Sequence, residues 1–488
     1  SNDVAPRGST ATILEQAGRQ NLGGQAFWSL GGLLMIDTPE QRRMRVRDSR
    51  DLAMNDWMGS AQFDRPEDHW PREWAQAYLD FAAGEMRTWL YDLGMRWFPV
   101  VGWAERGGSF ANGHGNSIPR FHITWGTGPG VLKPFEDRVL EAEKAGKVTF
   151  ACRHRVTGLD IHNGTVAGVS GEVLAPDDAE RGAATNRDVI DSFAIRADQV
   201  IVTSGGIGGN FDLVRRNWDA SKSGPLPEKM VSGVPEHVDG LLLDIVKDAG
   251  AELINTDRMW HYTEGVQNWN PIWPKHGIRI LPGPSSMWFD ATGDRLPAPC
   301  MPGFDTMSTL HEICRRGHDH TWFVLPQKII EKEFALSGSE QNIDLTEGGW
   351  KDVLKARLGK GATPAVEAFM EKGEDFVVDN DFDAMVAGKN QLGGNLIDPA
   401  KLRTQIETRD AQIDTPFTKD AQVSAIHTAR NYLGDKLIRT AKPHKILDPT
   451  KGPLIAVKLH VVTRKTLGGI HTDLDGRVFA PGGATIDG

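Results

Sequence analysis

The sequence is poor in cysteine, and the few cysteines it has are scattered. Its 488 residues include three, Cys152, Cys300 and Cys314. An odd, widely spaced set argues against a disulfide framework and for a reducing compartment, and it lacks the paired spacing of a zinc site. We therefore expect a cytoplasmic protein with no structural metal.

Long apolar runs and an excess of positive charge are also missing. No stretch approaches the roughly 18 consecutive apolar residues of a membrane span, and no basic segment followed by an apolar core opens the chain as in a signal peptide. Lys and Arg number 55 against 65 Asp and Glu, a net charge of −10. Such a chain has no overall positive field to attract phosphates, which argues against a nucleic-acid partner.

Several catalytic signatures are absent, whereas glycine and tryptophan are abundant. We find no G-x-G-x-x-G between an opening strand and a helix, no P-loop, no G-x-S-x-G elbow and no H-E-x-x-H. Glycine accounts for 54 residues, and tryptophan outnumbers tyrosine 15 to 4. Glycine permits sharp turns and close approach to a ligand, and tryptophan supplies large flat apolar walls.

Two features near the N-terminus are typical of cofactor binding. Residues 10–15 form a short apolar run that ends in Glu15, which predicts a buried parallel strand. Dinucleotide-binding folds use an acid at such a strand end to hold ribose hydroxyls, although an ordinary surface glutamate is the alternative. Glycine pairs follow at 23–24 and 31–32, where main-chain N–H groups could reach a phosphate or a flat ring, or where the chain simply turns.

Two later segments also end in small residues. Residues 199–202 predict a strand that leads into T-S-G-G-I-G-G-N, which would leave room for a cofactor at the edge of a parallel sheet, unless it is only a tight turn. The second segment, T-L-G-G at 466–469, follows Arg464 and Lys465. These cations could bind an anionic substrate or stabilise developing charge, the alternative being a solvated rim.

Helices are expected from periodicity and capping at residues 39–59, 71–93, 237–250, 327–337, 349–358 and 399–408. Four histidines, His114, His122, His318 and His320, have no companion cysteine or carboxylate cluster with metal-ligand spacing. We interpret them as polar groups beside a ligand rather than as a metal site.

Read in order, these segments resemble one flavoprotein family. I-L-E-Q at 13–16, G-G-Q-A-F-W-S-L-G-G at 23–32, V-I-V-T-S-G-G at 200–206 and A-V-K-L-H-V-V-T-R-K-T-L-G-G-I at 456–470 are similar to segments of the fumarate reductases and 3-ketosteroid Δ1-dehydrogenases. Within that family the sequence looks most like the FAD-binding dehydrogenases described as steroid-dehydrogenase-like.

The resemblance implies an α/β fold and FAD as the cofactor. A discontinuous Rossmann-like FAD-binding domain (1–255 and 452–488) would carry an inserted α+β capping or substrate domain (256–451). The FAD-contacting positions that it implies are Glu15, Gly23, Gly24, Gln25, Ala26, Gly31, Gly32, Val156, Thr203, Ser204, Gly205, Leu467, Gly468 and Gly469.

The sequence departs from the family pattern at its ends. The family opens with V-V-V-G-x-G-x-x-G and a helix, whereas here Asp3-Val4 runs directly into Ala5. The family also continues beyond the counterpart of Gly488 into L-Y-A-A-G-E. Both segments contact FAD in the family, so we expect the full protein to carry them.

The family's catalytic residues do not transfer. The stretch at 304–310 has no arginine where fumarate reductases carry their proton donor, and G-P-L-I at 452–455 has no tyrosine where steroid Δ1-dehydrogenases have G-P-Y-Y. We take as catalytic candidates the groups able to move a proton or polarise a carbonyl, namely Tyr262, His122, Arg464 and Lys465, with His318 as a further proton carrier.

The implied function is an FAD-dependent dehydrogenase that transfers hydride to flavin N5 from a C–C bond next to a carbonyl. Tryptophans between residues 260 and 322 would suit a bulky apolar, steroid-like substrate, unless they are ordinary core residues. Alternatives are fumarate reductase-like reduction of a small unsaturated carboxylate, a flavin oxidase, or a flavin-free, non-catalytic relative. The partners expected are a small-molecule substrate and an unidentified electron acceptor, and homo-oligomer formation stays open.

Overall fold

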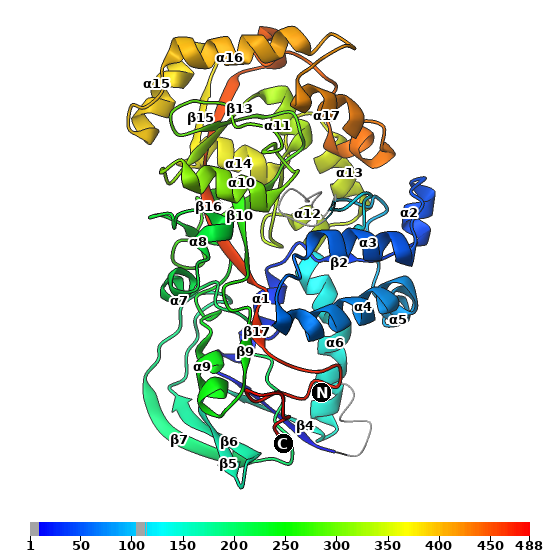
Figure 1. Ribbon diagram of the computed structural model, residues 1–488, viewed down its shortest axis with the longest axis vertical. Helices are drawn as coiled ribbons and strands as arrows, with labels where there is room; N and C mark the ends of the chain where they lie inside the picture. The colour runs from blue at the N-terminus through cyan, green and yellow to red at the C-terminus, as the bar shows by residue number, and fades with distance from the viewer. Residues whose placement is uncertain (1–8, 104–112, 114) are drawn as a thin grey trace.

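The computed structural model describes residues 9–103, 113 and 115–488. The motif at Asp3-Val4-Ala5 and His114 lie outside the described residues. Figure 1 shows two bodies, one above the other, joined by long strands. The upper body holds the segments between α10 (Thr306–Arg315) and α17 (Ala421–Ala429). The lower body holds α6 (Thr127–Lys144), β4 (Val148–Cys152) and the C-terminus.

The predicted N-terminal strand is confirmed. β1 (Ala11–Glu15) pairs in parallel with β4 (Val148–Cys152), with Glu15 opposite Cys152 at the carboxyl end. A parallel pair needs a long crossover, and α6 (Thr127–Lys144) supplies its last part. Glu15 therefore stands at the strand edge where dinucleotide-binding folds place their ligands.

Each of the first two predicted helices is divided. Residues 39–59 form α2 (Pro39–Arg43) and α3 (Arg50–Ser60), separated at Arg45, which has a φ of +61° that a helix does not accommodate. Residues 71–93 form α4 (His69–Ala83) and α5 (Met86–Asp92), separated by Gly84. The predicted start of α2 is confirmed, since Thr38 caps it in a capping box with Gln41.

The strand predicted at 199–202 is wrong. The segment has no regular structure, and the side chain of Ile201 is 69% exposed. Its Val200 N–H donates to the carbonyl oxygen of Gly488 at 3.0 Å, so in the described part of the chain no neighbouring strand pairs with it. Strand propensity alone does not make a strand without a hydrogen-bonded neighbour.

An antiparallel sheet closes the lower body. It consists of β5 (His154–His162), β6 (Thr165–Leu174) and β7 (Val189–Arg196), in that order. Between β6 and β7, residues 175–188 leave the sheet and contact the N-terminal glycine-rich segment. We call residues 175–188 the strap.

An eight-stranded sheet forms the centre of the upper body. Its path is β12-β13-β16-β10-β11-β14, with β8 and β15 also paired to β16. The strands are β8 (Val231–Ser232), β10 (Met259–Gln267), β11 (Gly277–Leu281), β12 (Met287–Asp290), β13 (Thr321–Pro326), β14 (Ala335–Leu336), β15 (Phe376–Asp379) and β16 (Leu454–Thr466). β16 descends from this sheet into the lower body, where it delivers the T-L-G-G segment (Figure 1).

Helices pack around this sheet. The principal ones are α10 (Thr306–Arg315), α11 (Gln327–Glu333), α13 (Trp350–Leu358), α14 (Pro364–Lys372), α15 (Phe382–Gly393), α16 (Pro399–Gln412) and α17 (Ala421–Ala429). The helices predicted at 327–337, 349–358 and 399–408 correspond to α11, α13 and α16, and the one at 237–250 is the shorter α9 (Leu241–Asp248). Among the described residues, every helix is too short or too polar to span a bilayer.

Candidate active site

Glu15 lies where a ribose-binding acid is expected. Its Oε1 accepts a hydrogen bond from the main-chain N–H of Ala17 at 2.8 Å. A small cavity lies beside this turn, lined by Ala17, Asn21, residues 182–185, Arg187, Glu236 and His237. The strap thus forms one wall of the space next to the predicted ribose-binding residue.

Four of the predicted cofactor-binding glycines are required by packing. A Cβ on Gly23 would lie 2.3 Å from the Leu132 side chain, and one on Gly31 would lie 2.4 Å from the Thr127 backbone. On Gly32 it would fall inside the Phe121 ring, and on Gly468 it would lie 1.8 Å from the Asn255 carbonyl oxygen. These glycines let neighbouring segments approach closely, which is a packing requirement that holds whether or not a cofactor is bound.

Three other glycines face open space. A Cβ on Gly24, Gly205 or Gly469 would meet no heavy atom within 4 Å, and all three have positive φ. They come from three segments that the sequence assigned to FAD. Open main chain of this kind is what a phosphate or a flat ring needs for close approach, so the residues present fit the cofactor.

This contrast predicts different effects of two Gly→Ala substitutions. We expect Gly468→Ala to lower the melting temperature, because its methyl group would overlap the Asn255 carbonyl oxygen. Gly24→Ala should weaken FAD retention more than it lowers stability, by roughly tenfold in the FAD dissociation constant. Thermal unfolding and flavin titration of both variants test this, and equal effects of the two on both measurements would contradict it.

The glycine motifs at 203–206 and 466–469 lie next to each other in the structure. Thr466 Oγ1 accepts a hydrogen bond from the Ile207 N–H at 2.9 Å, and a Cβ on Gly206 would lie 2.3 Å from that oxygen. The T-S-G-G segment at 203–206 therefore lies against the T-L-G-G segment at 466–469. Leu467 itself is 60% exposed, so its main chain rather than its side chain is anchored.

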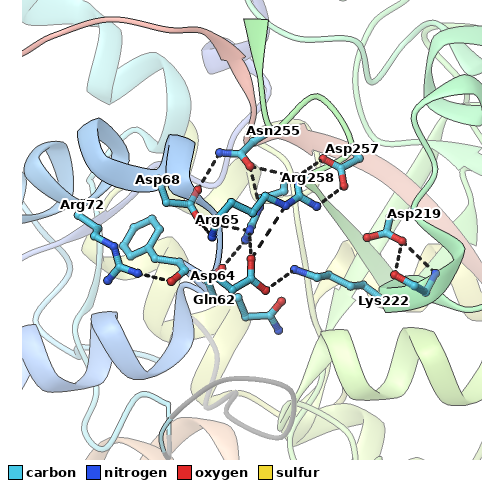
Figure 2. Close-up of polar contacts among 12 residues, drawn as sticks. Gln62, Asp64, Arg65, Asp68, Arg72, Asp219, Lys222, Asn255, Asp257 and Arg258 are labelled. Carbon is cyan, nitrogen blue, oxygen red and sulfur yellow. Dashed lines mark hydrogen bonds and ion pairs between the residues drawn. The ribbon is translucent and has the colours of Figure 1, made fainter.

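Arg258 holds the T-L-G-G segment in place. Its carbonyl oxygen accepts hydrogen bonds from the N–H groups of Leu467 at 2.9 Å and Gly468 at 3.3 Å. Its guanidinium lies in the polar network of Figure 2, donating to Asp64 Oδ1 at 2.6 Å and to the Gln62 carbonyl oxygen at 2.7 Å. Because several bonds fix the side chain, the carbonyl that supports the glycine segment is fixed as well.

The rest of the network ties three distant segments together. Arg65 makes a two-pronged pair with Asp257 at 2.7 and 2.6 Å, and Asn255 Nδ2 donates to Asp68 Oδ1 at 2.9 Å. Lys222 of α8 (Ala220–Ser223) donates to the second oxygen of Asp64 at 3.0 Å. Figure 2 shows these side chains converging from the segments around 62–68, 219–222 and 255–258.

We predict that Arg258→Ala loosens the T-L-G-G segment and lowers FAD affinity by about tenfold, since a charge-assisted hydrogen bond contributes about 1.5–3 kcal/mol and the half-exposed Asp64 partner places the effect toward the lower value. Flavin titration measures the change. Arg72→Ala is the matched control, because Arg72 lies at the edge of Figure 2 and, among the described residues, donates only to the Phe63 carbonyl oxygen. Equal FAD affinity in Arg258→Ala and the unaltered protein would contradict the assignment.

The strap covers the segment at 19–28. Arg181 donates to the Leu22 carbonyl oxygen at 2.7 Å, and its guanidinium lies 3.9 Å from the centre of the Phe27 ring. Gly182 packs on the Trp28 ring, where a Cβ would come within 2.5 Å. Local sequence patterns do not reveal this contact, because it joins residues that lie 159 positions apart in the chain.

Two of the predicted catalytic residues lie on the neighbouring strands β10 and β16. Trp260 is opposite Lys465, and Tyr262 is opposite Val462. The Lys465 Nζ lies 4.8 Å from the centre of the Trp260 ring. The side chains of Tyr262 and Lys465 therefore belong to one ribbon that leads into the T-L-G-G segment.

Tyr262 lies in a buried charged layer. The Arg279 guanidinium is 3.7 Å from the centre of its ring, and Arg279 Nε is 3.4 Å from Glu264 Oε2. Both charged side chains are less than one-tenth exposed. Sequence reasoning missed Arg279 and Glu264, since their burial depends on the pairing of β10 with β11.

Arg464 reaches from β16 to the N-terminal glycine-rich segment. Its Nη1 donates to the Gly233 carbonyl oxygen at 2.9 Å, and its Nη2 lies 3.5 Å from the Trp28 carbonyl oxygen. These carbonyls are its hydrogen-bond partners within the described residues. Because both acceptors are neutral, they do not balance the positive charge of the guanidinium, which can therefore bind an anionic group.

Glu340 and His276, which the sequence did not single out, lie close to Arg464. Burial raises the pKa of Glu340 to about 7, and the Arg464 charge opposes that rise. Burial, with a smaller contribution from Arg464, lowers the pKa of His276 to about 3. The distance between His276 Nε2 and Glu340 Oε1 is 3.9 Å.

The remaining histidines are placed elsewhere. His122 is fully buried in β3 (Phe121–Ile123), where Nε2 bonds the Thr38 hydroxyl at 2.8 Å and Nδ1 bonds the Arg120 carbonyl oxygen at 2.9 Å. Burial lowers the pKa of His122 to about 4. Because both of its ring nitrogens are hydrogen-bonded, we do not include His122 among the catalytic residues proposed below. His318 is exposed, in the turn before β13.

Three other residues predicted to contact FAD lie in regular secondary structure. Gln25 and Ala26 form the short helix α1 (Gly24–Phe27), and Val156 pairs with Gly171 between β5 and β6. Of the tryptophans expected to face a substrate, Trp288 and Trp322 lie in the core of the upper body. Trp273 packs on His276 with ring centres 3.5 Å apart, and it touches Trp28.

Comparison with known proteins agrees with this geometry. A family model described as FAD binding domain matches residues 3–488. A KsdD-like steroid dehydrogenase from Mycolicibacterium smegmatis is 55% identical over 100% of this chain and 88% of its own length.

Two solved structures share the fold. A 3-ketosteroid Δ1-dehydrogenase from Sterolibacterium denitrificans, in complex with 1,4-androstadiene-3,17-dione, has a TM-score of 0.61 at 14% identity, covering 100% of this chain and 90% of that one. A 3-ketosteroid-Δ4-(5α)-dehydrogenase from Rhodococcus jostii, in complex with 4-androstene-3,17-dione, has a TM-score of 0.59 at 16% identity, covering 100% and 86%.

Proposed function

The chain belongs to the FAD-binding domain family, and from this premise we propose that it is an FAD-dependent dehydrogenase of 3-ketosteroid-like substrates. The observation that carries the proposal is the end-to-end identity of 55% with a KsdD-like steroid dehydrogenase. Similarity of that extent covers the cofactor segments and the upper body alike.

The site geometry supports a substrate with a carbonyl oxygen and an apolar body. Arg464 offers a positive charge whose hydrogen-bond partners in the described part of the chain are main-chain carbonyls. Trp28 and Trp273 meet edge to face beside it, with ring centres 5.4 Å apart. A polar anchor surrounded by flat apolar walls is typical of sites for large apolar ligands.

FAD, when bound, accepts the hydride that leaves the substrate carbon. The chain's own residues would do the rest. Removal of a proton next to a carbonyl places negative charge on the carbonyl oxygen, and we assign Arg464 to stabilise it, with Lys465 as a second cation at the rim. Gly24, Gly205 and Gly469 would hold the cofactor through their open main chain, and Glu15 would hold its ribose.

Anaerobic mixing with 4-androstene-3,17-dione tests the proposal. We expect the flavin absorption of the purified protein to bleach on mixing. A panel of ketosteroids that differ in the position of the existing double bond would then identify the bond oxidised. A protein that binds FAD but is bleached by no 3-ketosteroid would overturn the substrate assignment.

The electron acceptor and the alternative reaction are separated by two further arms of that experiment. Reoxidation of the reduced protein by fumarate would indicate the carboxylate reductase. Rapid reoxidation by dioxygen would indicate an oxidase. Slow reaction with both, and fast reaction with an artificial electron carrier, is the result expected of a dehydrogenase.

A further inference from the structure

We propose that the Glu340 carboxylate is the base that removes the substrate proton, with His276 facing its second oxygen. This inference rests on the proposed function and adds a catalytic residue to it. It arises from one buried carboxylate with an oxygen that has no hydrogen-bond partner among the described residues.

Glu340 is a buried carboxylate with an incomplete set of hydrogen-bond partners. Its side chain is 15% exposed, and its Oε2, which is itself enclosed by protein, has no hydrogen-bond partner among the described residues. A buried carboxylate normally has partners for both oxygens, because an unsatisfied charged group is costly. An enclosed oxygen without a partner is suited to accept a proton once a ligand reaches it.

His276 faces the other oxygen of the carboxylate. Its Nδ1 accepts a hydrogen bond from the Ile272 N–H at 3.2 Å and lies 3.2 Å from Asn268 Nδ2, so two donors face the same nitrogen. The neutral ring must then carry its hydrogen on Nε2, which lies 3.9 Å from Glu340 Oε1, too far for a direct hydrogen bond. Trp273 stacks on the ring and holds its plane. The imidazole N–H therefore faces Oε1 rather than Oε2, which keeps no partner among the described residues.

The groups around Glu340 place it beside the predicted flavin segment. Ser339, its neighbour in sequence, donates from Oγ to the Phe27 carbonyl oxygen at 2.7 Å. Arg464, the charged group that faces Glu340 from β16, lies next to the Trp28 carbonyl oxygen. His276 is the titratable group that faces it from the segment before β11. Both contacts lead to the G-G-Q-A-F-W-S-L-G-G segment at 23–32.

Another buried carboxylate shows what a structural role looks like. Glu333 in α11 is fully buried, and burial raises its pKa to about 7, as for Glu340. Its oxygens, however, accept hydrogen bonds from the Ser285 hydroxyl at 2.6 Å, the Ser285 N–H at 2.8 Å and the Ala441 N–H at 2.8 Å. Glu333 is thus also buried and has a similar pKa, but both of its oxygens have hydrogen-bond partners.

The step balances with the groups named. The C–H bond next to the carbonyl breaks, its proton forms an O–H bond to Glu340 Oε2, and the electron pair moves toward the carbonyl oxygen near Arg464. The neighbouring C–H bond would then break with its electron pair, which bound FAD would take up as hydride, while the pair held at the carbonyl oxygen would return to form the new C=C bond. The substrate would thereby lose two electrons, and Glu340 would release its proton to water.

Glu340→Gln and its matched control Glu333→Gln test the inference in the FAD-loaded protein. We expect Glu340→Gln to reduce the rate of flavin bleaching by 4-androstene-3,17-dione by about 10²- to 10⁴-fold, with FAD affinity retained. The rate in the unaltered protein should rise with pH through about 7, because the base must be ionised, and then level off. Glu333→Gln should keep both the rate and this pH profile, whereas Glu340→Gln should lose the profile.

Infrared titration gives a second readout that needs no turnover. In the unaltered protein the C=O band of protonated carboxylic acids should weaken as pH rises through neutrality, and Glu340→Gln should remove one component of that change. A rate and pH profile unaltered in Glu340→Gln would overturn the inference. If no 3-ketosteroid bleaches the unaltered protein, the proposed function fails by itself, and an infrared difference unchanged by Glu340→Gln would then overturn the role of Glu340 independently.

Discussion

Replacing Arg464 with methionine is expected to reduce kcat/KM for a 3-ketosteroid by about 100- to 1,000-fold, the loss typical of removing one preorganised donor to a developing oxyanion. The guanidinium is held by the carbonyl oxygens of Gly233 and Trp28, so its position is set before the substrate arrives. Methionine keeps most of the length of the side chain but neither the charge nor the donors. The measurement is the rate of anaerobic flavin bleaching as a function of substrate concentration.

Two further variants make the Arg464 result specific. Arg464→Lys retains the charge but cannot bond both carbonyls and the substrate, so its rate should fall between those of the unaltered protein and Arg464→Met. Arg477→Met removes a charge that is 62% exposed and paired with Asp473, so it should leave turnover unchanged. Full activity in Arg464→Met, with FAD bound normally, would remove Arg464 from the proposed site.

The second large effect concerns stability rather than turnover. Lys389→Met should raise the free energy of unfolding at pH 7 by up to roughly 4 kcal/mol, at about 1.4 kcal/mol per pH unit of pKa shift. Lys389 is fully buried in α15, and its Nζ has no hydrogen-bond partner among the described residues. The Phe289 and Trp322 rings face the ammonium group, with their centres 5.5 and 5.1 Å away.

The sign of the effect follows from burial, which lowers the pKa of Lys389 from 10.5 to about 7. Between those two values the unfolded chain binds a proton that the folded chain does not, so the stability of the unaltered protein should rise as pH increases from 7 to about 10. Lys389→Met should lose this part of the pH dependence. Denaturant unfolding at several pH values measures it, with Lys401→Met as the exposed control, and equal slopes for all three proteins would contradict the prediction.

The sequence predicted the local parts of the site well because local chemistry determines them. An apolar run that ends in an acid is enough to expect β1 and Glu15 at its edge, and the glycine pairs are visible without a structure. Their separate roles are not visible. Gly24 and Gly468 look alike in sequence, yet one faces open space and the other is pressed against the Asn255 carbonyl oxygen.

The features that the sequence did not reveal all depend on distant pairing. S-G-S-E-Q-N around Glu340 contains no motif that marks a site, and its burial depends on distant segments such as Phe27, whose carbonyl oxygen accepts a hydrogen bond from Ser339. His122 looked like a candidate proton carrier, but the pairing of β2 (Gly32–Leu34) with β3 encloses it. The segment at 199–202 failed as a strand for the opposite reason, since no partner strand pairs with it in the described part of the chain.

The contact between Arg464 and Trp28 has a consequence for how the protein is made. The two residues are 436 positions apart in the chain. At about 5–20 residues per second, a ribosome needs roughly 20–90 s to synthesise the interval between them. During that time the segment at 23–32 has left the ribosome, whereas the segment at 464–469 has not yet been made. A nascent chain stalled before residue 464 therefore cannot complete the pocket, and FAD capture has to follow the synthesis of β16.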